Sequence, residues 1–172
     1  MVNPAGIHER ADPAVRKIEG LSPINRTSAG VSPPELLEIK ENGLRFFVDI
    51  FHGQKTGFYL NQCDNRKTVA EYATAKNVLD GFSYSGGFGV HALSAGAHSV
   101  TSVDSSAACL ELFGKNYELN NFLIPGDSTI KGDVFQLLRM FREQNRNFDM
   151  VILDPAKFAH GAPGEPQSLH LL

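Results

Sequence analysis

The chain has 172 residues, of which 42% are hydrophobic and 20% are charged, and these proportions are typical of one ordinary globular domain. A chain of this length buries a core without disulfide or metal cross-links. Its net charge of −3 argues against a domain that grips nucleic acid by charge alone. The two cysteines form no CxxC pair and the six histidines lack ligand spacing, so we expect no metal site.

From the N-terminal sequence we expect no secretory signal peptide. Its first residues, MVNPAGIHERADP, hold charges and prolines where a signal peptide has an apolar run. No stretch of the chain approaches the roughly 18 apolar residues of a membrane span. We therefore expect a cytoplasmic protein that has no membrane partner.

The first third of the chain changes character at residue 35. Residues 1–34 are rich in proline and glycine, which predicts an irregular lead-in or linker. In residues 35–61, Asn42-Gly43 separates two runs of strand formers and His52-Gly53 marks a second turn. This pattern predicts a small antiparallel β-hairpin unit of about three strands.

Residues 62–159 alternate between two kinds of pattern. Short apolar runs lie at 77–84, 99–106, 128–135 and 148–155, and helical patterns lie at 61–74, 87–96, 105–120 and 133–144. This alternation predicts βαβ units, and therefore an α/β fold in which helices cover a parallel sheet. Residues 160–172 have no place in the alternation, and we expect them to form an irregular tail.

A glycine-rich turn, DGFSYSGGFG at 80–89, follows the first of these strands. Ligands of open parallel sheets bind at the carboxyl ends of the strands, where glycines let the backbone approach them closely. Asp104 ends the second strand, where a carboxylate can accept hydrogen bonds from ribose hydroxyls. The pattern predicts a nucleoside cofactor. A dinucleotide is an alternative because residues 87–92 match G-x-G-x-x-A, and a tight turn without a ligand is another.

The third and fourth strands also end in acidic residues. Asp133 could accept the amino group of adenine, and it could equally be the N-cap of the next helix. Asp154-Pro155 suits a rigid loop that faces a planar base, where the carboxylate would hold an exocyclic amine and Phe158 would stack. The alternative is a strand that simply ends at a proline turn.

Two further segments, HERADPAVRKIEGL (8–21) and VDIFHGQKTGFYLNQCDNR (48–66), join these strand ends in a family resemblance. Over residues 7–159 the chain resembles the bacterial 23S rRNA cytosine-C5 methyltransferases of the large-subunit methyltransferase I type. The resemblance implies a Rossmann-like class I methyltransferase sheet, of which the first half is present, with S-adenosylmethionine (SAM) as cofactor and 23S rRNA as partner. It also implies that residues 62–159 form a partial SAM-binding domain.

The resemblance assigns two sets of site residues. Those implied to bind the cofactor are Phe82, Ser83, Tyr84, Ser85, Gly86, Gly87, Phe88, Asp104, Ser105, Asp133, Val134 and Asp154. Those implied to lie beside the target cytosine are Asp154, Pro155 and Lys157.

The chain departs from the family pattern in three places. Cys63 stands where the family has arginine, and Ala156 replaces the second proline of an Asp-Pro-Pro-Lys-Phe loop. The chain also ends just past the fourth strand, whereas the family continues with further strands, and an RNA-binding PUA domain precedes the hairpin unit. We therefore expect a truncated or frameshifted chain, or a fragment, whose uncovered sheet edge favours self-association.

The implied reaction requires a cysteine thiolate. Carbon C5 of cytosine is a poor nucleophile until a thiolate adds to C6. Cys109 falls inside a helical pattern and is expected in the core, while Cys63 precedes the first sheet strand, so we expect the nucleophile to be absent. The alternatives are a methyltransferase for exocyclic amines, a non-catalytic SAM-binding remnant and a dinucleotide-dependent oxidoreductase.

Overall fold

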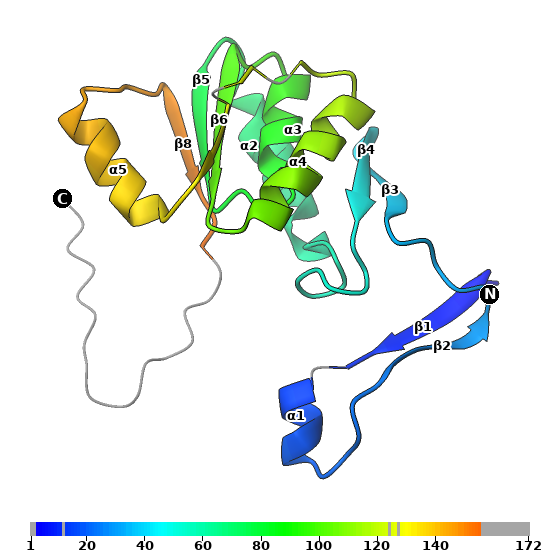
Figure 1. Ribbon diagram of the computed structural model, residues 1–172. Helices are drawn as coiled ribbons and strands as arrows, with labels where there is room; N and C mark the ends of the chain where they lie inside the picture. Colours follow the sequence, from blue (N-terminus) through cyan, green and yellow to red (C-terminus); the bar gives the residue numbers. More distant parts are fainter. Residues whose placement is uncertain (1–2, 12, 124, 127, 156–172) are drawn as a thin grey trace.

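The computed structural model describes residues 3–11, 13–123, 125–126 and 128–155, and its centre is a four-stranded parallel sheet in the order β7-β6-β5-β8 (Figure 1). The strands are β5 (Asn77–Gly81), β6 (Ser99–Asp104), β7 (Thr129–Lys131) and β8 (Met150–Leu153). Between them run α3 (Gly87–Ser94), α4 (Ala107–Leu119) and α5 (Val134–Glu143), and before them a 3-10 turn η1 (Leu60–Gln62) continues into α2 (Cys63–Glu71). The predicted α/β fold is confirmed.

Helices cover both faces of the sheet. Successive side chains of β5 point to opposite faces, so Val78 packs with Ala92 on the side of α2 and α3. Leu79 packs with Phe141 of α5 on the opposite side. Figure 1 shows α5 across the sheet from α3 and α4. Burial of both faces explains why the neighbouring residues Val78 and Leu79 are both apolar, without the alternation of a strand that has one solvated face.

A β-hairpin packs on the outer side of the helical layer. Its strands are β3 (Leu37–Glu41) and β4 (Leu44–Val48), which pair antiparallel. Asn42 and Gly43 form the turn with φ angles of 50° and 83°, as the Asn-Gly signal predicts. Phe46 of β4 packs against Val90 of α3 and Tyr117 of α4, so the hairpin shares a hydrophobic core with these helices.

The prediction of about three strands in the hairpin unit is wrong. Residues 49–59, all of which are described, form consecutive turns after β4. Asp49 ends the strand because its carboxylate accepts the N–H groups of Phe51 and His52 at 2.9 and 2.8 Å. Gly57 then adopts a φ of 91°, which a strand does not permit.

The prediction of an irregular lead-in is wrong for residues 6–30. Strands β1 (Gly6–Arg10) and β2 (Asn25–Gly30) pair antiparallel, and α1 (Pro13–Ile18) connects them. The turn formers stand at the ends of these elements, with Pro13 as the first residue of α1 and Gly20, at a φ of 71°, just beyond it. The predicted division of the chain at residues 34, 61 and 159 stays a prediction, and the tail at 160–172 lies outside the described residues.

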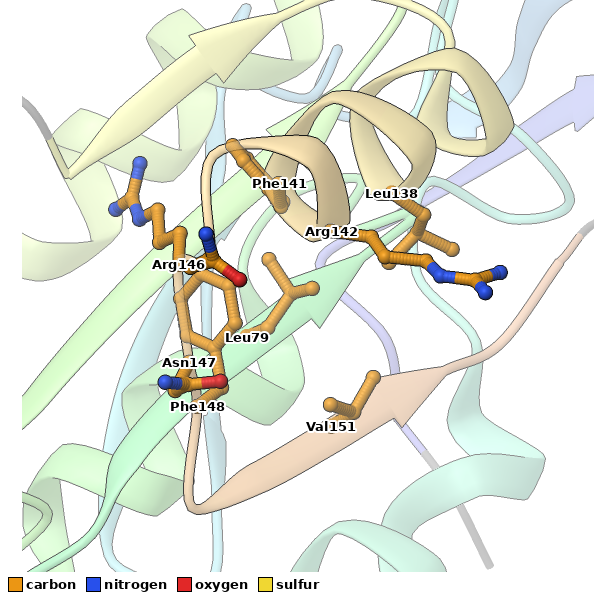
Figure 2. Close-up of a pocket in the computed structure, with 9 residues that line it drawn as sticks. Leu79, Leu138, Phe141, Arg142, Arg146, Asn147, Phe148 and Val151 are labelled. Atoms are coloured by element: carbon orange, nitrogen blue, oxygen red, sulfur yellow. The ribbon is translucent and has the colours of Figure 1, made fainter.

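The edge of the sheet at β8 is partly open. Among the described strands, β8 pairs with β5 alone, and Val151 and Leu153 are 50% and 48% exposed. A hollow of about 370 Å³ lies between β8 and α5, beside the amino end of β8 (Figure 2). Figure 2 shows Val151 on β8 across this hollow from Leu138 and Arg142 of α5. None of the helices in the described part is long and apolar enough to cross a membrane.

Candidate functional site

A larger cavity, of about 630 Å³, lies at the carboxyl ends of β5, β6 and β8. The chain runs from β5 to β6 and β7 in one direction and then returns through α5 to place β8 on the other side of β5. The strand order therefore reverses at β5, and open α/β sheets bind ligands at such a point. Its sheet-derived walls are Phe82, Ser83, Tyr84, Ser85, Gly87, Phe88, Asp104, Ser105, Asp154 and Pro155. Its other walls come from the segment before the sheet, through Gln54, Lys55, Thr56, Phe58, Tyr59, Leu60, Asn61, Gln62 and Arg66.

The turn after β5 is unusually tight. Phe82, Tyr84 and Gly86 have φ angles of 61°, 49° and 80°, and the N–H of Gly86 donates to the carbonyl oxygen of Ser83 at 2.8 Å. A Cβ atom at position 86 would lie 2.4 Å from Cδ2 of Phe113, so only glycine fits there. Gly86 therefore shapes the turn from below, and its neighbours face the cavity.

Asp104 is fixed against this turn. Its Oδ2 accepts the N–H of Tyr84 at 2.9 Å, and its Oδ1 accepts the N–H of Ser106 at 2.9 Å. A carboxylate oxygen has more than one acceptor position, so both oxygens can still accept hydrogen bonds from a ligand. The structure thus brings together the glycine turn and the acidic residue that the sequence placed on separate strands.

Two tyrosines tie the preceding segment to the turn. The hydroxyl of Tyr84 accepts the N–H of Gln54 at 3.0 Å and donates to the carbonyl oxygen of Gly57 at 3.2 Å. Burial raises the pKa of Tyr84 to about 12, which keeps this donor protonated at neutral pH. The ring of Tyr59 meets that of Tyr84 edge-on, with centroids 5.8 Å apart.

Asp154 projects from the end of β8 into the same cavity. The carboxamide of Gln62 donates through Nε2 to both oxygens of Asp154, at 3.1 and 3.0 Å. Asn65 in turn donates to Oε1 of Gln62, so the carboxamide has a fixed orientation. Sequence reasoning assigned no role to Gln62, although this residue stands in the segment at 48–66 that carries the family resemblance. Lys157, predicted beside Asp154 and Pro155, lies outside the described residues.

Arg66 is a second residue that sequence reasoning missed. It is 3% exposed and forms a two-pronged ion pair with Glu41 of β3, with Nε–Oε1 and Nη2–Oε2 distances of 2.6 and 2.8 Å. Nη2 also donates to the carbonyl oxygen of Tyr59 at 2.9 Å. The guanidinium Cζ lies 4.4 Å from the ring centroid of Phe58. Arg66 therefore joins the hairpin, α2 and the wall of the cavity.

Asp80 lies beneath the turn and is 1% exposed. Its Oδ2 accepts the N–H of Gly89 at 3.1 Å, and it does not line the cavity. Burial raises its pKa from 3.8 to about 7, since a charged carboxylate is poorly solvated there. Sequence reasoning also missed this buried acid, because it counted Asp80 as the first residue of the glycine-rich turn.

The raised pKa of Asp80 makes stability fall with rising pH. Between about pH 4 and about pH 7 the folded chain holds a proton that the unfolded chain has lost, so the stabilisation present at low pH is lost through this window. We expect Asp80→Asn to remove this slope, so that the variant gains stability relative to wild type as pH rises. Urea unfolding at several pH values between about 4 and about 7 measures the free energy of unfolding of both proteins. Asp149→Asn is the control, because hydrogen bonds from Asn77 lower the pKa of Asp149 instead of raising it. If the stability of Asp80→Asn changed with pH in parallel with that of the wild type, the prediction would be contradicted.

Three predicted cofactor residues do not line the cavity: Gly86, which lies beneath the turn, and Asp133 and Val134. Asp133 is the N-cap of α5, where its Oδ1 accepts the N–H of Gln136 at 2.9 Å. Val134 is buried in the core beside Leu79 and Val103. The helix-cap alternative for Asp133 is what the structure shows, and an adenine contact for either residue stays a prediction.

Neither cysteine lines the cavity. The Sγ atom of Cys63 lies 3.9 Å from Oδ1 of Asn42, on the hairpin side of α2. Cys109 lies in the first turn of α4 and is half-buried rather than in the core. Desolvation raises the pKa of both thiols, which disfavours the thiolate form. In the described chain, no group of three His, Cys, Asp or Glu side chains could hold a metal ion.

Comparisons with known proteins agree with this geometry. Residues 25–168 match the family described as S-adenosylmethionine-dependent methyltransferase. The chain is 50% identical over 153 residues to the ribosomal RNA large subunit methyltransferase I of Aeromonas salmonicida. The aligned residues make up 89% of this chain and 39% of that protein. For the protein of the same name from Enterobacter sp., identity is 45%, over 88% of this chain and 38% of the relative. The chain thus spans about two-fifths of the length of these curated relatives.

Solved structures with a similar fold are also methyltransferases. A protein from Streptococcus mutans described as a SAM-dependent methyltransferase superposes with a TM-score of 0.72 and 30% identity, over 77% of this chain and 36% of that one. The methyltransferase SMU.776, solved with SAH, has a TM-score of 0.71 and 31% identity, over 77% and 35%. The family match rules out the dinucleotide oxidoreductase, and the G-x-G-x-x-A residues begin inside α3 rather than in the turn. Family profile, sheet order and strand-end cavity together show that the chain belongs to the S-adenosylmethionine-dependent methyltransferase family.

Proposed function

We propose that this chain binds SAM in the cavity at the strand ends and forms the cofactor side of a methyltransferase that acts on C5 of a cytosine in 23S rRNA. The observation that carries the proposal is the β5 turn bonded to Asp104 at the wall of a cavity of about 630 Å³. The lining fits the cofactor. The hydroxyls of Ser83 and Ser85 are buried and have no hydrogen-bond partner among the described residues, which favours a ligand that brings polar atoms to this wall.

The chain's own residues divide the work of binding and orientation. Bound SAM supplies an electrophilic methyl group. Asp104 accepts hydrogen bonds from the ribose hydroxyls, and the turn at residues 82–88 encloses the methionine end. Asp154, held by Gln62, faces the cavity where it accepts the exocyclic amine of the base.

RNA is the proposed methyl acceptor because the curated relatives carry the name of a ribosomal RNA methyltransferase. Transfer to an exocyclic amine is a second candidate, and it is favoured by the absence of a cysteine from the described cavity walls. The two differ in product, so liquid chromatography of nucleosides from methylated RNA, with mass detection and reference standards, separates the isomers 5-methylcytidine and N4-methylcytidine.

Calorimetric titration with SAM tests the proposal. We expect Asp104→Ala to weaken SAM binding by about tenfold or more, because charge-assisted hydrogen bonds to the ribose are lost. Asp149→Ala is the matched control, since Asp149 sits before β8 at the opposite end of the sheet and bonds to Asn77. SAM binding that is unaltered in Asp104→Ala, or absent in folded wild type, would refute the proposed pocket.

We also propose that two copies associate through the edge of β8. The edge lacks a strand partner among the described residues, and Val151 and Leu153 beside it are about half exposed. We expect Val151→Lys to weaken self-association by about tenfold, since a charge on this face opposes close contact. Leu123→Lys, at a residue that is 91% exposed elsewhere, serves as control. Sedimentation velocity over a concentration series that shows only monomer would contradict the proposal.

A further inference from the structure

Arg66 has donors that its ion pair does not use. Glu41 takes Nε and one N–H of Nη2, and the carbonyl oxygen of Tyr59 takes the other N–H of Nη2. Among the described residues, Nη1 has no hydrogen-bond acceptor, although Arg66 lines the cavity. A guanidinium presents five N–H donors, so a buried arginine with a free Nη1 beside a cavity can bind an anionic group there.

The surroundings of Nη1 favour an anion. Nη1 lies 3.5 Å from the position that a Cβ atom would take at Gly87, the first residue of α3. Free amides and the helix dipole attract negative charge at a helix N-terminus. Two hydroxyls that are more than nine-tenths buried and unpartnered, those of Ser83 and Ser85, line the same cavity. Together these groups suit a ligand that has a carboxylate group and other polar groups close to it.

We propose that Arg66 binds the α-carboxylate of the methionine portion of the cofactor through Nη1. The proposal rests on the proposed function, and it adds a specificity element that is separate from the ribose contact of Asp104. Glu41 fixes the plane of the guanidinium, so the Nη1 donor is held in place before the ligand arrives. SAM analogues that lack the carboxylate therefore lose a preformed contact.

Calorimetry with SAM and with decarboxylated SAM tests the proposal, and the measured quantity is the ratio of their affinities. We expect wild type to prefer SAM by about tenfold to a hundredfold, the range of a charge-assisted hydrogen bond. The test variant is Glu41→Leu/Arg66→Met, which removes both buried charges, leaves the net charge unchanged and avoids an unpaired Glu41. We expect its ratio to fall by about tenfold or more. A purely structural role would weaken both ligands equally and leave the ratio intact.

Lys55→Met is the matched control, because Lys55 is another cation in the cavity lining and is exposed. Its ratio should equal that of wild type. Loss of preference in Lys55→Met, an unchanged ratio in the double variant, or equal binding of both ligands by wild type would overturn the role of Arg66 while the SAM pocket stands. Wild type that is folded and binds neither ligand would overturn the proposed function itself.

Discussion

Arg66→Met is expected to lower the free energy of unfolding by about 3–5 kcal/mol, because it leaves the buried carboxylate of Glu41 without its partner. Glu41 is 8% exposed, and its other cationic candidate, the imidazole Nε2 of His91, lies 3.6 Å away. Burial lowers the pKa of His91, so this ring is a weaker cationic partner for Glu41 than the permanently charged guanidinium. Urea unfolding followed by far-UV circular dichroism measures the loss.

The double variant Glu41→Leu/Arg66→Met provides the matched comparison. It removes both charges together, and replacing a whole buried ion pair with apolar side chains of similar volume is often close to neutral. We therefore expect the double variant to recover most of the stability that the single variant loses. A double variant as unstable as Arg66→Met would show that the loss comes from packing on Phe58 and not from the unpaired charge.

Asn116→Ala is expected to cost about 3 kcal/mol, because it unpairs several buried backbone groups at once. Oδ1 of Asn116 accepts the N–H of Phe47 at 2.6 Å, and Nδ2 donates to the carbonyl oxygens of Ser85 and Phe47 at 2.9 and 3.3 Å. One fully buried side chain on α4 thus holds the hairpin and the β5 turn together. We expect SAM affinity to fall with stability.

Asn120→Ala is the control for Asn116→Ala. Asn120 lies one turn further along α4 and makes similar bonds to the backbone N and O of Arg45, at 2.9 and 2.7 Å, at a half-buried position. Water replaces these bonds more readily, so we expect a loss below about 1 kcal/mol and unchanged SAM binding. Equal losses of stability for the two variants would contradict the argument from burial.

Local patterns determined how much of the fold could be predicted from the sequence. The period of the apolar residues located the four sheet strands and their helices, and Asn42-Gly43 located the hairpin turn. The same signals failed where a turn former marks the end of an element, as Pro13 does at the start of α1. Proline and glycine restrict the backbone in both situations, and only tertiary pairing decides between them.

The candidate site divides in the same way. Residues on strand ends, such as Asp104 and Asp154, could be predicted because the carboxyl ends of parallel strands meet at one edge. Gln62 and Arg66 could not be predicted, because their roles depend on Asp154 and Glu41, which are distant in sequence. Asp133 had two possible roles in the sequence, and the structure shows its helix cap.

The segment at residues 49–57 lies between two contacts. On one side, Nη1 of Arg10 in β1 donates to the carbonyl oxygen of Ile50 at 3.0 Å, and on the other, the hydroxyl of Tyr84 bonds to Gln54 and Gly57. A shift of this segment that follows from an event at the β1–β2 ribbon therefore also moves the wall of the cavity. The β1–β2 ribbon and the cavity, which share no side chain, are thus mechanically connected through a single segment of consecutive turns.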